Sequence, residues 1–379
     1  MLQQNGSAAE MHKIQTPAIL LDLDILERNI KNFAAKNLWP MLKTHKCTEI
    51  ARMQLDHGAA GVLCGTLDEC EAILAKFVQG EKRDIGIMYA YPVAGQPNIT
   101  RVIQLARECN FYLRLDHFEQ AKLLNYAAKE AQACINYSVI INCGLDRFGI
   151  TPSELEPLLC KISDFTHLKF CGISTHPGHA YRESNNAWIQ GVAKQESDTM
   201  GEATEVLRRM GIVPQFVGSG STPTHPLIKN SEVINMFHPG NYVFMDNFQV
   251  SLGVATQQDC ALTVLTTVIA APRTGEFMID AGSKCFGLDK GAHGNVKIQG
   301  HGLVKGFAMA EVKSLSEEVG KIVMNGDSGL KIGDKIEIIP NHSCATANNT
   351  SYFIGVRNGA PERILDVDMR GNSTRPIIP

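Results

Sequence analysis

The chain has 379 residues with 36 basic and 39 acidic side chains, which leaves a formal net charge of −3. This balance, without a basic cluster, predicts no nucleic-acid partner. The longest apolar stretch, Ala261–Pro272, is shorter than a membrane-spanning helix, so no membrane association is expected. Residues 1–15 contain no apolar segment, which predicts a flexible tail rather than a signal peptide, and eleven cysteines without a framework indicate reduced thiols and a cytoplasmic location.

Residues 16–250 alternate short apolar runs with longer amphipathic stretches. The apolar runs predict eight strands at Leu38–Leu42, Gly61–Cys64, Ile85–Tyr89, Phe111–Leu115, Tyr137–Cys143, Leu168–Thr175, Val213–Val217 and Val233–Phe237. The clearest helices are expected at Glu49–Asp56, Leu67–Phe77, Phe118–Ala131, Pro152–Ile162 and Asn186–Met210. Eight such alternations favour a closed (β/α)8 TIM-like barrel, and a doubly wound open sheet is the alternative.

Residues 251–379 lack a long helical pattern and predict a β-rich second domain. Gly, Asn and Asp separate its candidate strands, as turns require. These strands are expected at Val264–Ile269, Phe277–Ile279, Lys305–Val312, Lys321–Val323, Lys335–Ile339 and Tyr352–Ile354.

Polar residues follow several barrel strands at the point where each strand ends, and this is the rim on which barrel enzymes carry their chemistry. Lys43 follows the first strand, where partial desolvation makes a lysine amine nucleophilic and suited to Schiff-base formation. A solvated rim lysine is the structural alternative. Arg147, His176 and Tyr181 follow the fifth and sixth strands.

The sequence G-S-G-S-T after the seventh strand offers backbone N–H groups and hydroxyls that suit a phosphate. Its candidate residues are Ser219, Gly220, Ser221 and Thr222, and Tyr242 after the eighth strand could add a phenol to the same phosphate. A glycine turn with a helix cap is the structural alternative.

The second domain contains P-N-H-S-C, in which His342 and Cys344 are two residues apart. On a strand this spacing places both side chains on one face, where imidazole and thiolate together suit zinc. A buried histidine beside an inert cysteine is the alternative.

Together these motifs resemble those of the D-threonine aldolase / D-serine dehydratase family of pyridoxal-phosphate enzymes, which combine an alanine-racemase-type barrel with a C-terminal β domain. The matching segments run in order from T-P-A-I-L-L-D-L-D through L-K-T-H-K, H-P-G-H-A-Y, G-S-G-S-T-P-T, P-G-N-Y-V-F-M-D and D-A-G-S-K to P-N-H-S-C. They extend from Thr16 to about Val356, nearly the whole chain.

The resemblance implies a role for each matching residue. Lys43 corresponds to the Schiff-base lysine, and His342 with Cys344 to a divalent-metal pair, with zinc preferred and manganese or magnesium as alternatives. The expected pyridoxal 5'-phosphate contacts are Lys43, Arg147, His176, Tyr181, Ser219, Gly220, Ser221, Thr222 and Tyr242. One departure is His238, which stands where alanine racemases usually have an arginine paired with the pyridine nitrogen.

The resemblance further implies a lyase acting on D-β-hydroxy amino acids, and Cys344 favours a D-serine dehydratase over a D-threonine aldolase. An amino-acid racemase would need a second base opposite Lys43, and a non-catalytic cofactor carrier would lack the second domain. A homodimer is also implied by the resemblance.

Overall fold

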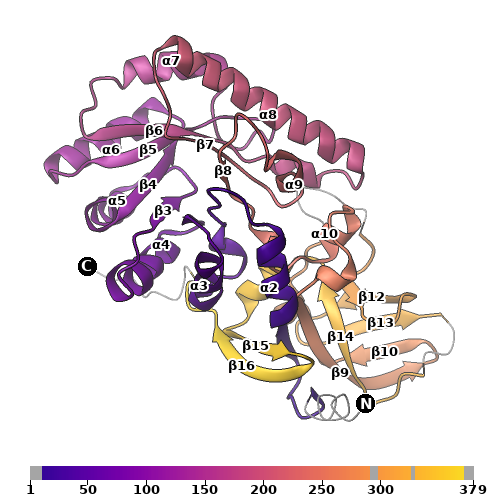
Figure 1. Ribbon diagram of the computed structural model, residues 1–379. Coiled ribbons are helices and arrows are strands. Elements are labelled where there is room, and N and C mark those ends of the chain that lie inside the picture. Colours follow the sequence, from indigo (N-terminus) through magenta and orange to yellow (C-terminus); the bar gives the residue numbers. More distant parts are fainter. Residues whose placement is uncertain (1–10, 291–297, 326–328, 371–379) are drawn as a thin grey trace.

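The computed structural model describes residues 11–290, 298–325 and 329–370, which form two sheets, a seven-stranded parallel sheet and a nine-stranded mixed sheet. Figure 1 shows the parallel sheet with its helices in the upper part of the view and the second sheet below it. Residues 1–10 of the predicted tail lie outside the described residues. In the described residues no helix is both long and apolar enough to cross a membrane.

The parallel sheet is the predicted barrel, and its strands pair in chain order from β2 to β8. They are β2 (Gly61–Cys64), β3 (Gly86–Tyr89), β4 (Asn110–Leu115), β5 (Ile135–Ile140), β6 (Leu168–Ser174), β7 (Phe216–Ser219) and β8 (Met236–Phe237). The helical segments before and between them are α3 (Thr48–Asp56), α4 (Leu67–Ile73), η2 (Leu74–Gly80), α5 (Gln96–Glu108), α6 (Phe118–Glu130), α7 (Pro152–Lys161), η3 (Gly178–Tyr181), α8 (Asn186–Arg209) and α9 (His225–Ile228). This alternation confirms the predicted fold class.

The segment predicted as the first barrel strand, Leu38–Leu42, is irregular but still connects the two ends of the parallel sheet. Trp39 N donates to Phe237 O of β8 at 2.8 Å, and Leu63 N of β2 donates to Pro40 O at 2.9 Å. Only isolated bridges form here, because Pro40 has no N–H and the chain then enters the 3₁₀ turn η1 (Leu42–Thr44).

Two glycines at the starts of neighbouring strands make room for the buried Trp39 indole. A Cβ atom at Gly86 would lie 2.0 Å from the Trp39 ring, and one at Gly61 would lie 2.7 Å from it. The bottom of the barrel is therefore closed by an aromatic ring that any larger residue at these positions would displace.

The second sheet contains a strand from the N-terminal end of the chain. β1 (Ala18–Asp22) pairs with β9 (Leu262–Arg273) and with β15 (Tyr352–Arg357), and α2 (Leu23–Asn32) then leads to the barrel. The predicted barrel range of 16–250 therefore includes one strand of the second sheet, because the apolar run A-I-L-L-D is buried there.

The remaining strands of the second sheet are β10 (Glu276–Ile279), β11 (Gly302–Val304), β12 (Ala310–Leu315), β13 (Gly320–Met324), β14 (Lys335–Pro340) and β16 (Ala360–Asp366). The predicted single strand Lys305–Val312 is wrong, because Gly306, at φ 82°, reverses the chain between β11 and β12. The short helical segments of this half are η4 (Asn241–Val243), α10 (Asn247–Ser251), η5 (Gln257–Asp259), α11 (Ser283–Phe286) and α12 (Ser343–Asn349).

Candidate active site

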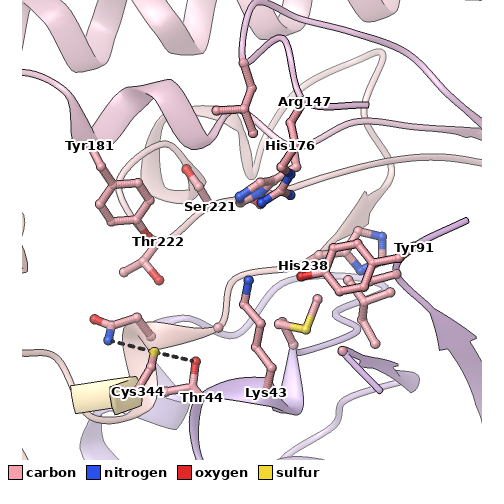
Figure 2. Close-up of a pocket in the computed structure, with 18 of the residues that line it drawn as sticks. Lys43, Thr44, Tyr91, Arg147, His176, Tyr181, Ser221, Thr222, His238 and Cys344 are labelled. Carbon is pink, nitrogen blue, oxygen red and sulfur yellow. Dashed lines mark hydrogen bonds between the residues drawn. The ribbon is translucent and has the colours of Figure 1, made fainter. Parts of the chain in front are cut away.

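A cavity of about 590 Å³ opens at the carboxyl ends of the barrel strands and is covered on one side by α12 of the second domain. Residues after β2, β5, β6, β7 and β8 line it, as expected for a barrel enzyme. Figure 2 shows Lys43, Thr44 and Cys344 along one wall, with His176 and Ser221 across the cavity from them.

Lys43 lies in η1 and reaches into this cavity from the segment that closes the barrel. A Cβ atom at Gly65 would lie 2.9 Å from the Lys43 Cβ, so the glycine allows the loop after β2 to pack against the lysine. Buried Glu69 pairs with Lys46 and accepts the Gly65 N–H at 2.6 Å. These contacts tie the lysine's turn to the loop that packs on it.

The predicted phosphate loop divides between two environments. Gly220, Ser221 and Thr222 line the cavity, and a Cβ atom at Gly220 would lie 2.6 Å from the backbone N of His238. Ser219 does not line it, because its hydroxyl donates to the buried carboxyl of Glu196 on α8. The structure therefore places the hydroxyl of Ser219, which was predicted to contact the phosphate, behind the loop.

Tyr242 also lies away from the cavity, contrary to the prediction that it adds a phenol to the phosphate. The side chain is fully buried, its ring stacks on Phe33 at 4.9 Å, and its hydroxyl accepts from Gln54 Nε2 at 2.9 Å. Its apolar ring and satisfied hydroxyl make it a core residue between the two domains.

His176, Tyr181 and Arg147 all line the cavity. His176 Nδ1 lies 2.9 Å from the carbonyl oxygen of Gly220, and since a carbonyl only accepts, Nδ1 carries the proton. Arg147 is exposed, with its guanidinium 5.3 Å from the centroid of the Phe148 ring. Burial raises the pKa of the Tyr181 phenol, so the phenol stays protonated at neutral pH.

His238 presents a hydrogen-bond acceptor to the same cavity. Its Nδ1 lies 3.1 Å from the carbonyl oxygen of Trp39 and therefore donates, while Nε2 is buried and has no partner in the part of the chain that the structure describes. Burial, and then the positive charge of Arg114, hold the pKa of His238 well below its usual range. The imidazole is therefore neutral, with the Nε2 lone pair facing the cavity.

Arg114 is a cavity residue that the sequence analysis missed, and a charged residue in the apolar run N-F-Y-L-R-L of β4 was the available signal. Its Nε and Nη2 atoms are buried and have no hydrogen-bond partner within residues 11–290, 298–325 and 329–370. Burial lowers the pKa of Arg114 to about 10, so the guanidinium is still charged at neutral pH. A buried cation without a carboxylate favours an anionic ligand nearby.

His342 and Cys344 lie at the start of α12, not on a strand as predicted, yet both line the cavity. The Cys344 thiol contacts Thr44 Oγ1 at 3.4 Å, which places it beside the residue that follows Lys43. Burial opposes both charges, but the mutual attraction of imidazolium and thiolate raises the pKa of His342 and lowers the pKa of Cys344.

Buried Asp246 fixes the turn that carries this pair. Its Oδ2 accepts the Ser343 N–H at 2.9 Å and the Asn241 amide at 2.9 Å, and its Oδ1 accepts the Gln249 N–H at 3.1 Å. Asp246 ends the motif P-G-N-Y-V-F-M-D, but its role depends on its contact with Ser343, which lies 97 residues further along the chain.

Comparison with known proteins agrees with this architecture. The alanine racemase N-terminal domain family matches residues 21–248, and the putative serine dehydratase domain family matches residues 261–356. The chain is 31% identical to D-serine dehydratase of Dictyostelium discoideum over 93% of this chain and 96% of that protein. The chain belongs to the D-serine dehydratase / D-threonine aldolase family of pyridoxal-phosphate lyases.

Other members of this family are similar over nearly their full length. The 3-hydroxy-D-aspartate aldolase of Paracoccus denitrificans is 28% identical over 95% of this chain and 93% of that protein. The D-threonine aldolase structure from Filomicrobium marinum superposes with a TM-score of 0.85 at 28% identity, covering 96% of this chain and 97% of that one.

The family implies pyridoxal 5'-phosphate, and the cavity residues fit this group. The Gly220–Thr222 loop has no side chain at Gly220 to fill the space against His238, and its hydroxyls suit a phosphate. Lys43 supplies an amine in the same cavity, and Arg114 with Arg147 supplies positive charge for anionic groups.

A divalent metal fits the His342–Cys344 pair by its chemistry. His342 Nδ1 lies 3.4 Å from Asp289 Oδ2, which leaves Nε2 for a cation, and carboxylates commonly occupy this position behind metal-binding histidines. Among the described residues no cluster of three or more His, Cys, Asp or Glu could hold a metal. The protein would therefore contribute two ligands and leave the other positions to water or substrate.

Proposed function

We propose that this protein is a D-serine dehydratase that converts D-serine to pyruvate and ammonia with pyridoxal 5'-phosphate and a divalent metal ion. The observation that supports it is the contact between Cys344 and Thr44, which brings the metal pair next to Lys43 in one cavity. Lys43 as a base for the Cα proton and the metal pair as a site for the β-hydroxyl therefore lie close together in this cavity.

When bound, the cofactor supplies stabilisation of negative charge at the substrate Cα. The chain's own residues bind and orient the reacting groups. Lys43 would receive the Cα proton, and Arg114 and Arg147 would balance the charge of the cofactor phosphate and the substrate carboxylate. The Tyr181 phenol and the His176 imidazole would limit the entry of water from the barrel rim.

The metal would be held by His342 Nε2 and the Cys344 thiolate, and would supply Lewis-acid chemistry at the β-hydroxyl. Zinc suits this pair best, since thiolate is a soft ligand, and manganese or magnesium are the alternatives. A relative supports metal dependence, because one structure of D-threo-3-hydroxyaspartate dehydratase is a cysteine-to-alanine mutant in the metal-free form.

D-threonine aldolase activity is the second candidate, because the same arrangement of amine and metal could cleave Cα–Cβ once the hydroxyl is deprotonated. The structural similarity to the D-threonine aldolase of Filomicrobium marinum supports it. The dehydratase is favoured by the 31% identity to D-serine dehydratase and by the thiolate at Cys344.

Product identification from D-threonine, with purified protein, pyridoxal 5'-phosphate and zinc, separates the two reactions. Loss of water gives 2-oxobutyrate and ammonia, which is the expected result. If glycine and acetaldehyde form instead, the protein is an aldolase, and Cys344 does not distinguish a dehydratase from an aldolase. D-serine is then assayed for pyruvate to establish the substrate.

We also propose that the protein is a homodimer, on the resemblance of its fold to the alanine racemase type. Light scattering of the cofactor-loaded protein at micromolar concentration tests this. A mass near 83 kDa, twice the chain mass of 41.5 kDa, is expected, and a mass of one chain would exclude it.

A further inference from the structure

Helix α8 carries a carboxyl group where its pattern calls for an apolar residue. Its buried stripe runs through Ile189, Val192, Ala193, Glu196 and Met200, at the spacing of one helix face. Glu196 is completely buried, and among the described residues its Oε2 atom has no hydrogen-bond partner. A buried carboxyl without a cation is costly to ionise, so its presence requires an explanation outside the helix itself.

The carboxyl group holds the phosphate loop from behind. The hydroxyl of Ser219 donates to Glu196 Oε1, and the hydroxyl of Thr224 faces the carboxyl and lowers its pKa. Thr224 Oγ1 in turn lies 3.0 Å from the hydroxyl of Ser221, which lines the cavity. Glu196 therefore connects to both ends of the segment that would bind the phosphate.

The groups around Glu196 provide no positive charge. From β7 and the loop after it, the carboxyl is faced by the hydroxyls of Ser219 and Thr224. From the loop after β5 it is faced by the thiol of Cys143, whose pKa is raised by burial and further by the Glu196 charge. Within the described part of the chain, no ion pair to Glu196 is found.

We propose that Glu196 is a positioning residue for the phosphate-binding loop, and that its ionisation weakens phosphate binding at Gly220–Thr222. This inference rests on the proposed cofactor site. Burial, partly opposed by the Ser219 and Thr224 hydroxyls, raises the pKa of Glu196 to about 7. The neutral form therefore supports the loop at lower pH, and a carboxylate repels the phosphate at higher pH.

The test measures binding of inorganic phosphate to cofactor-free protein by calorimetry at pH 6.0 and pH 8.5. The substitution Glu196→Gln keeps the oxygen acceptor and removes the charge. At pH 8.5 it is expected to bind phosphate about ten-fold more tightly than the unaltered protein, because a buried negative charge behind the loop repels an anion through a medium of low dielectric constant. At pH 6.0 the two proteins are expected to differ little.

A matched control is Glu202→Gln, which removes an exposed carboxylate from the same helix and should behave as the unaltered protein at both pH values. Because the variants are compared at one pH, the ionisation of phosphate itself contributes equally to all the measured affinities. Equal affinities of Glu196→Gln and the unaltered protein at pH 8.5 would overturn the proposal.

A second variant, Thr224→Val, removes the hydroxyl that links Glu196 to Ser221 and keeps the carboxyl. It should weaken phosphate binding at pH 6.0, and unchanged binding would contradict the positioning role even if Glu196→Gln did not fold. Cofactor absorption measured on the unaltered protein distinguishes the two proposals. If pyridoxal 5'-phosphate binds but Glu196→Gln and Thr224→Val bind phosphate as the unaltered protein does, only the role of Glu196 fails. If the cofactor does not bind, the proposed function and the role of Glu196 are both overturned.

Discussion

The two sides of the cavity are each supported by one buried carboxyl group, and the two carboxyls are stabilised in different ways. On the metal side, Asp246 accepts hydrogen bonds from Ser343, Asn241 and Gln249 and lies near the His342 charge. On the phosphate side, Glu196 faces the hydroxyls of Ser219 and Thr224 and the thiol of Cys143.

The comparison shows that burial alone does not determine what a carboxyl group does. Burial raises the pKa of both groups, but the backbone N–H donors and the His342 charge oppose that shift at Asp246. The donors and the His342 charge around Asp246 favour its carboxylate form, which suits a region that would hold a cation. A readily neutralised Glu196 suits a region that would hold a phosphate.

Lys43 lies between the two sides, and its loss should have the largest effect. Lys43→Ala is expected to lower kcat for D-serine by at least about 10³-fold, since it removes the proposed proton acceptor. The absorption band of the covalent cofactor–lysine bond should also disappear. A persisting band would show that another amine holds the cofactor.

The variant His342→Ala tests the metal side of the cavity and leaves the phosphate side unaltered. Turnover should fall by about 10²-fold or more, because the chain would retain one metal ligand, while cofactor absorption stays unchanged. The measurement is pyruvate formation with and without added zinc, compared with the unaltered protein treated with a chelator. Full activity after chelation would contradict the metal assignment.

A smaller effect is expected when the support of the metal pair is weakened. Asp246→Asn keeps the size of the side chain but replaces one acceptor oxygen by an NH2 group, so the side chain cannot accept from Ser343 and Asn241 at one atom and from Gln249 at the other. Zinc affinity should fall about 10- to 100-fold, as for other residues that orient metal ligands. Competition with a chromogenic chelator measures it, and unchanged affinity would assign Asp246 to folding only.

The smallest expected change concerns stability on the phosphate side. Because the pKa of Glu196 is raised from 4.5 in the unfolded chain to about 7, its stabilising contribution is full below pH 4.5 and is lost as the pH rises through 7. Glu196→Gln should therefore unfold at a higher temperature than the unaltered protein at pH 8.5, by an amount equivalent to about 3 kcal/mol or less. Thermal unfolding of the cofactor-free proteins at pH 5 and pH 8.5, with Glu202→Gln as control, checks the sign.

Much of the barrel and the catalytic rim could be predicted because their signals are local. The apolar runs give β2 at its observed bounds, and Lys43, His176 and Gly220–Thr222 follow strand ends and do line one cavity. Ser219 and Tyr242 do not line the cavity, because residue type and position do not show which side of a loop a hydroxyl faces. Glu196 on the apolar stripe of α8 was a local signal that could have been used.

The sequence by itself determined the alternation of strands and helices, the order of the motifs and the residue types available for binding phosphate and metal. These depend on side-chain periodicity and on the intrinsic chemistry of lysine, thiol and imidazole. Only the tertiary structure decided that β1 belongs to the second sheet, that Cys344 contacts Thr44 and that Asp246 and Glu196 support opposite sides of the cavity. The physical reason is that strand pairing and the environment of a carboxyl group depend on which distant segments pack together and exclude water. The spacing of residues along the chain does not determine this packing.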